Sequence, residues 1–108
     1  MKRPTKTHLI CYVLDQVNIP MTREDILRRV YILQPGKVNF RATSNKSYFD
    51  PCNGPHRSWG MPGHRCMDIS LVVKKLIKKS GRNSKRFMLY ALTPKGKKLA
   101  DEYFAWAQ

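Results

Sequence analysis

The chain has 108 residues, a length typical of one domain, and its 42% hydrophobic content is enough for a compact core. Its 21 Lys and Arg against 7 Asp and Glu give a formal net charge of +14. Such a charge points to a polyanionic partner, which can be DNA, RNA, an anionic membrane or an acidic protein face. No apolar run reaches the roughly 18 residues of a membrane-spanning helix, so we expect no membrane protein.

The cysteine content bears on the cellular compartment. Cys11, Cys52 and Cys66 cannot all pair within one chain, so reduced thiols or a metal site fit better than a disulfide scaffold. The first apolar stretch is cut by Asp15 and lacks a small-residue cleavage site, unlike a secretory signal. We therefore expect a cytoplasmic, nucleoid-associated protein, and the small size and basicity also fit a viral origin.

Two helices are predicted near the amino terminus. Apolar residues recur at helical spacing over residues 5–18, and Pro20 ends this pattern. A second helix is predicted to start at Thr22, whose side chain can cap it, with Glu24 and Asp25 in its first turn. It ends before Pro35 and Gly36. The short connection makes the two helices packed neighbours.

Residues 34–66 break this pattern and are predicted to form a long insertion. They are rich in Gly, Pro, Asn and Ser, and such a stretch is usually functional or disordered, although its aromatic residues favour partial packing. Two thiols and two imidazoles lie within it, and together they make a complete tetrahedral set for one structural zinc ion. The four candidate ligands are Cys52, His56, His64 and Cys66.

The spacing of these four residues, C-x3-H-x7-H-x-C, differs from that of a standard zinc finger. Two alternatives therefore stay open: incidental loop residues, or a disulfide between Cys52 and Cys66 in an oxidising compartment. Asp50 and Asp68 are nearby substitutes if one ligand is wrong.

A third helix is predicted over residues 67–79, because Ile69, Val72, Val73, Leu76 and Ile77 form one apolar stripe. Asp68 would cap this helix, and Ser80 and Gly81 would stop it. A polar turn over residues 82–86 precedes a short apolar run, 87–92, which predicts a strand whose partner lies just before Gly81 or early in the insertion. A last helix begins with Thr93 as cap and Pro94 as first residue.

Every charged residue from Ile69 to Ala100 is basic. Isolated lysines usually lie on a solvated helix face. Here the absence of any compensating acid favours contact with nucleic acid. Lysines on helix 67–79 would reach phosphates or guanine edges, and Leu71 would touch a thymine methyl. The predicted contact residues are Ser70, Leu71, Lys74, Lys75, Lys78 and Lys79 on the helix, and Arg82, Lys85 and Arg86 in the turn.

The order of three helices, a polar hairpin turn and a strand, followed by Leu92-Thr93-Pro94-Lys95-Gly96, resembles the winged helix-turn-helix family. The similarity is closest to bacterial regulators of the MarR and PadR kind. This resemblance implies an α+β fold with a three-helix core, a β-hairpin wing and a C-terminal helix, and DNA binding through residues 70–79 and the wing at 82–86. The sequence departs from the family at the 34–66 insertion.

We therefore expect one winged-helix domain over residues 1–108 that binds double-stranded DNA in transcriptional regulation, as a monomer or homodimer. Catalysis is not expected, since His8 and Cys11 share a helix face without a third orienting group. One alternative is an adaptor or inhibitor that grips an acidic face of a transcription or replication machine with Tyr48, Phe49 and Trp59 of the insertion. A second alternative is a basic RNA-binding protein.

Overall fold

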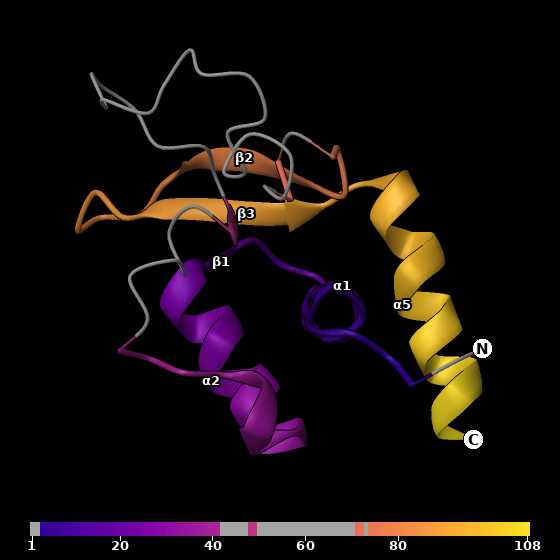
Figure 1. Cartoon of the computed structure of the whole chain (residues 1–108). Coiled ribbons are helices and arrows are strands. Elements are labelled where there is room, and N and C mark those ends of the chain that lie inside the picture. Colours follow the sequence, from indigo (N-terminus) through magenta and orange to yellow (C-terminus); the bar gives the residue numbers. More distant parts are fainter. Residues whose placement is uncertain (1–2, 42–47, 50–70, 73) are drawn as a thin grey trace, which may run out of the picture.

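The computed structural model describes residues 3–41, 48–49, 71–72 and 74–108. These residues form a mixed α+β fold in which a small antiparallel sheet lies over α1 (Lys6–Val17) and α2 (Arg23–Leu33), with α5 (Pro94–Ala107) beside it (Figure 1). The strands are β1 (Met21–Thr22), β2 (Ile77–Arg82) and β3 (Met88–Leu92), and a 3-10 turn (Pro35–Lys37) follows α2. Within the described residues, no helix is both long and apolar enough to cross a membrane.

The first two helices confirm their predictions to within a residue or two. Asn18 ends α1 in the left-handed region (φ 59°), where its N–H donates to the Leu14 carbonyl. Thr22 caps α2 as expected, since its hydroxyl oxygen accepts from the Asp25 N–H at 3.2 Å. The apolar periodicity and the cap residues were therefore sufficient to locate these elements.

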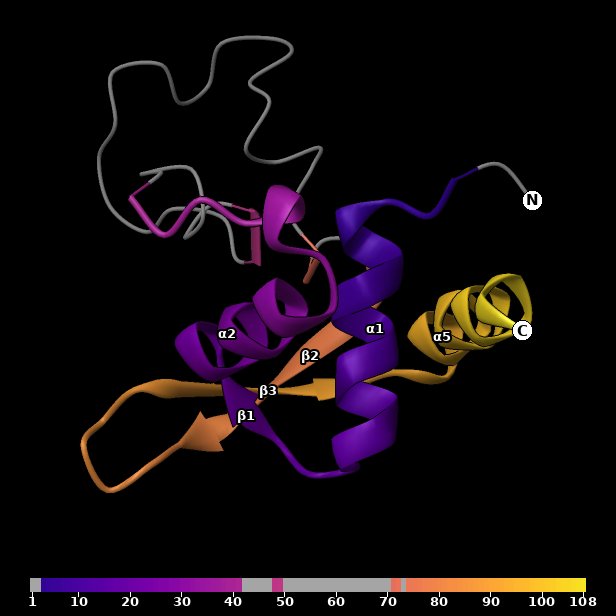
Figure 2. The same cartoon turned by 90° about the horizontal axis from the view of Figure 1, so that it is seen from below.

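The hydrophobic core lies where the helices meet the sheet. Figure 2 shows α1 between α2 and α5, so that α1 is covered on both sides. One core cluster unites α1, α2, α5, the sheet and residues of the chain between α2 and β2, among them Phe49, Leu71 and Leu76. Its fully buried side chains include Leu9, Ile10, Cys11, Ile26, Val30, Phe49 and Leu71.

The three strands are hydrogen-bonded in the order β1-β3-β2, all antiparallel. Ile77 lies opposite Leu92 and Lys79 opposite Tyr90, and the register then shifts before Arg82. Gly81 lies at this irregularity with φ 88°, a conformation that glycine adopts without strain. The predicted strand at 87–92 is confirmed as Met88–Leu92. One of its partners is β2, which includes the segment just before Gly81 that the sequence indicated, and the other is β1, which the sequence did not indicate.

The helix predicted over residues 67–79 is wrong in the part that the structure describes. Residues 71–72 and 74–76 form turns and a bend, and Ile77 begins β2, which also contains the predicted helix stop at Ser80 and Gly81. Lys75 has φ 61°, a left-handed conformation that no right-handed helix contains. The apolar spacing of Leu76 and Ile77 suits a buried strand entry equally well, and β-branched residues such as Ile77 favour extended chain. Pairing with β3 selects the strand over the helix for this segment.

The 34–66 insertion contributes directly to the core. Residues 48 and 49 are helical, and the Phe49 side chain is fully buried beside Tyr90, with ring centroids 5.4 Å apart. The carbonyls of Tyr48 and Phe49 accept from the N–H groups of Leu71 (2.9 Å) and Val72 (3.0 Å). The predicted packing of the insertion is thus confirmed at these positions. The idea that Phe49 grips another protein is wrong, because burial leaves its ring inaccessible.

Candidate nucleic-acid interface

The predicted basic residues lie on a β-hairpin and its approach rather than on a helix. We call residues 74–92 the basic hairpin; its turn extends past α2 in both views (Figures 1 and 2). Leu71 is fully buried, so its expected contact with a thymine methyl is wrong, and Ser70 lies outside the described residues. The exposed basic side chains are those of Lys74, Lys75, Lys78, Lys79, Arg82, Lys85 and Arg86.

The hairpin turn is held by its own hydrogen bonds. The Asn83 N–H donates to the Phe87 carbonyl at 3.0 Å, and Asn83 Oδ1 accepts from the N–H groups of Lys85 (3.0 Å) and Phe87 (2.9 Å). Arg82 Nη1 donates to the Arg86 carbonyl at 2.7 Å. These bonds fix the turn in one shape, so that the side chains of Lys85 and Arg86 project from a preformed tip.

The base of the hairpin is fixed to α5 through Thr93. Its hydroxyl donates to the carbonyls of Lys75 (2.5 Å) and Leu76 (3.0 Å), and its oxygen accepts from the Gly96 N–H at 3.1 Å. The Thr93 N–H adds a bond to the Leu76 carbonyl at 3.3 Å. The predicted cap is confirmed, and it also positions the turn that carries Lys74 and Lys75.

The carboxylates that the structure describes all lie on the helices and face basic partners there. Lys97 of α5 contacts both Asp15 (2.9 Å) and Asp101 (3.2 Å), and hydrogen bonds to these two carboxylates raise the pKa of Lys97. The remaining pairs are Glu24 with Arg28, Asp25 with Arg28, and Glu102 with His8. Among described residues, no carboxylate pairs with Lys74, Lys78 or Lys85. The positive field of the hairpin is therefore not neutralised by these acids.

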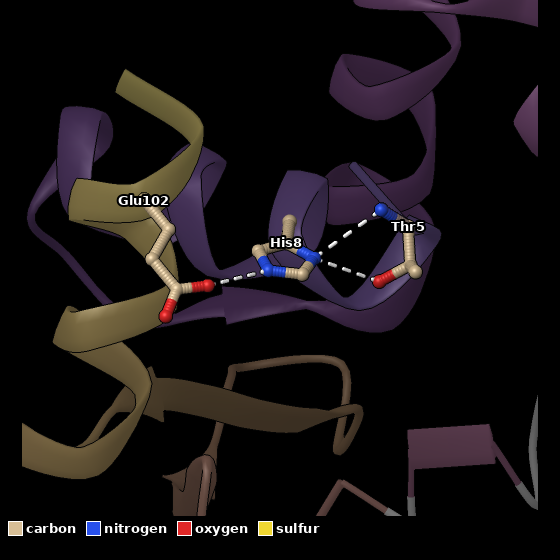
Figure 3. Close-up of polar contacts among 3 residues, drawn as sticks. All are labelled: Thr5, His8 and Glu102. Carbon is tan, nitrogen blue, oxygen red and sulfur yellow. Dashed lines mark hydrogen bonds and ion pairs between the residues drawn. The ribbon is translucent and has the colours of Figure 1, made fainter. Parts of the chain in front are cut away.

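His8 joins the start of α1 to α5 (Figure 3). Its Nδ1 accepts from the Thr5 N–H at 3.2 Å and lies 2.9 Å from Thr5 Oγ1, while Nε2 lies 2.8 Å from Glu102 Oε2. Because Nδ1 accepts the backbone N–H, the ring proton sits on Nε2 and is donated to Glu102. The arrangement is a capping box with histidine at the third helical position. Glu102 was missed from the sequence because it lies 94 positions away, with no local pattern to reveal it.

The structure does not assemble His8 and Cys11 into a catalytic pair. Both ring nitrogens of His8 face Thr5 and Glu102. Cys11 is fully buried, and burial raises the pKa of its thiol to about 12. A protonated, inaccessible thiol acts as a core side chain.

His8→Ala is expected to lower the free energy of unfolding by about 1–2 kcal/mol, because it removes the cap of α1 and the bond to Glu102. His8→Gln should retain most of this stability. A glutamine at the third helical position can accept from the Thr5 N–H through its oxygen and donate to Glu102 through its nitrogen. Urea denaturation of both variants measures the difference. Equal losses in the two variants would show that neither bond matters.

The predicted zinc ligands Cys52, His56, His64 and Cys66 lie outside the described residues, as do Asp50, Asp68 and Trp59. Over the ranges that are described, no three His, Cys, Asp or Glu side chains gather in a way that could hold a metal ion. The zinc site stays a prediction. Elemental analysis of protein purified without an affinity tag should find one zinc ion per chain, and Cys52→Ser should lose it while Cys11→Ala keeps it. Zinc-free wild-type protein would refute the site.

Comparison with known proteins adds no assignment: the chain matches no family model, no curated protein and no solved structure. The functional argument therefore rests on the chain's own charges and geometry.

Proposed function

We propose that this chain is a winged-helix protein that binds double-stranded DNA through the basic hairpin and acts in transcriptional regulation. The observation that carries the proposal is the exposed row of basic side chains on a projecting hairpin, with the described carboxylates confined to the helices. Neutralisation of phosphates by lysine and arginine supplies sequence-independent affinity for DNA, because it releases condensed counterions.

The topology supports the winged-helix part of the proposal. Two helices flank a short first strand, a hairpin follows, and the strand order is β1-β3-β2. In this reading the β2–β3 hairpin is the wing. The helical residues 48 and 49 lie between α2 and β2 in the chain, where the family has its third helix.

The length of β2 supports a duplex as the ligand. Basic residues flank this strand at Lys74 and Lys75 on one side and at Lys85 and Arg86 on the other. A strand rises about 3.3 Å per residue, so the five steps from Ile77 to Arg82 cover roughly 16 Å. This exceeds the widths of both the major groove, about 12 Å, and the minor groove, about 6 Å, so the two ends of the row can reach phosphates on both strands of a duplex.

The experiment that tests the proposal compares binding to a random-sequence duplex with binding to the matching single strand by gel shift, followed by selection and sequencing. We expect preference for the duplex and a steep loss of affinity with salt. An enriched motif would indicate specific reading. Preference for RNA or for the single strand would instead support the RNA-binding alternative.

Binding of an acidic protein is the second candidate function, and one surface favours it. The end of α2 exposes Tyr31, Ile32 and Leu33, with Ile32 78% exposed. Ile32 and Leu33 line an apolar groove of about 200 Å³ between α1 and α2, and Arg29 lies at the same groove. An apolar patch beside an arginine suits a partner that presents both apolar and acidic side chains. Complex formation that persists after the hairpin loses its charges would favour this candidate.

A further inference from the structure

Phe87 is an exposed aromatic residue at the turn of the basic hairpin, where the sequence pattern alone indicates only a strand. The strand begins one residue later, at Met88, and the Phe87 ring is 60% exposed. Arg86 and Lys85 precede it in the turn, and the ring lines a shallow hollow together with Arg23 and Glu24 of α2. Phosphate-binding side chains thus adjoin the apolar ring along the chain. The most exposed aromatic ring of the described hairpin thus lies where the turn closes, next in the chain to Lys85 and Arg86.

The backbone of Phe87 is fixed on both sides before any ligand binds. Its N–H donates to Asn83 Oδ1 at 2.9 Å, and its carbonyl accepts from the Asn83 N–H at 3.0 Å. The bond from Arg82 to the Arg86 carbonyl holds the preceding residue. Because the turn is already ordered, presenting the ring to a ligand costs little conformational entropy.

We propose that Phe87 is an apolar wedge that enters the minor groove and inserts between two base pairs when the hairpin binds duplex DNA. The inference rests on the proposed function, and it adds the groove, the inserted side chain and a bend in the DNA. Proteins that kink DNA from the minor groove insert Phe, Leu, Ile, Met or Pro between base steps and hold the backbone with Arg and Lys. The hairpin tip combines one such apolar side chain with Arg82, Lys85 and Arg86.

Placing the Phe87 ring between two base pairs is energetically reasonable, because binding offsets the cost of unstacking them. Separating one base step costs a few kcal/mol. Moving the exposed Phe87 ring out of water and between bases returns part of this cost, and the bend brings further phosphates to the lysines of the hairpin. Pyrimidine–purine steps unstack most easily, so we expect the wedge to prefer them.

The test uses a duplex that carries 2-aminopurine at a central TA step and a fluorophore pair at its ends. Binding of the wild-type chain should increase the 2-aminopurine fluorescence, which reports unstacking, and shorten the end-to-end distance. Phe87→Ala should lose both signals and weaken duplex binding about tenfold. Phe87→Leu is the matched variant, since it keeps an apolar wedge and should retain most of the bend. Both variants should melt like the wild type, because the ring is largely exposed.

The outcomes separate the wedge from the proposed function. Tight duplex binding without unstacking or bending, unchanged in Phe87→Ala, would overturn the wedge and leave duplex binding in place. Failure of the wild-type chain to bind any duplex would overturn both. A loss in Phe87→Ala that is confined to single-stranded DNA would show that the ring stacks on unpaired bases, and this would also overturn the wedge.

Discussion

Gly96→Ala is expected to lower the free energy of unfolding by about 3 kcal/mol, the upper end of the usual cost of overpacking. A Cβ atom at this position would lie 2.1 Å from the Leu76 carbonyl oxygen and 2.7 Å from Leu92 Cδ1. The Leu76 carbonyl cannot move aside freely, because the N–H and the hydroxyl of Thr93 both bind it. The substitution therefore forces the first turn of α5 away from the base of the hairpin.

Gly36→Ala is the matched control for this substitution. No atom lies within 4 Å of a Cβ built at Gly36, and its φ is not in the left-handed region. Its effect on the free energy of unfolding should stay within about 0.5 kcal/mol. Urea denaturation followed by circular dichroism measures both variants. Similar stability of the two variants would contradict the close approach of α5 to Leu76.

Removal of three charges from the hairpin is expected to weaken duplex binding by about 10- to 100-fold at low salt. The triple variant combines Lys78→Gln, Lys85→Gln and Arg86→Gln, which keep long polar side chains while deleting the charges. All three residues are exposed, and Lys78 and Lys85 form no ion pair with a described carboxylate. The fold should therefore be unaffected, and the loss should appear in binding alone. Fluorescence anisotropy with a labelled duplex gives the affinity.

The control removes the same total charge from other surfaces. It combines Arg3→Gln, Arg29→Gln and Lys98→Gln, which replace three exposed residues outside the hairpin. This variant should lose much less affinity than the hairpin variant, because close phosphate contacts dominate over the remote field at physiological salt. Equal losses in the two variants would mean that only net charge matters and that the hairpin is not the binding surface.

The elements with local signals could be predicted from the sequence, whereas long-range pairing could not. Thr22 and Thr93 carry local cap signals, and both caps are where the sequence placed them. Leu76 and Ile77 satisfy a helical stripe and a buried strand entry equally, and only the partner β3 selects the strand. Phe49 reaches the core through contacts with Tyr90, which lies far along the chain and leaves no local pattern.

In the candidate site, too, some features could be predicted from local sequence and others depended on long-range pairing. Its basic character follows from the composition, but its geometry depended on the helix that proved wrong, and so Leu71 was placed outside although it is buried. The segment Leu92-Thr93-Pro94-Lys95-Gly96, noted first as a resemblance, now has a physical basis. Thr93 bonds the hairpin base and caps α5, Pro94 begins the helix, and Gly96 permits contact with the Leu76 carbonyl.

The dependence of duplex affinity on salt is the most direct measurement of whether the basic hairpin binds DNA. For a protein that neutralises Z phosphates, the logarithm of the binding constant falls against the logarithm of salt concentration with a slope of about −0.9Z. If the three substituted side chains of the hairpin each contact a phosphate, the slope of the hairpin variant should be shallower than the wild-type slope by about 3. The control variant should keep the wild-type slope. A hairpin variant with the wild-type slope, or a wild-type chain whose affinity does not depend on salt, would contradict the proposed interface.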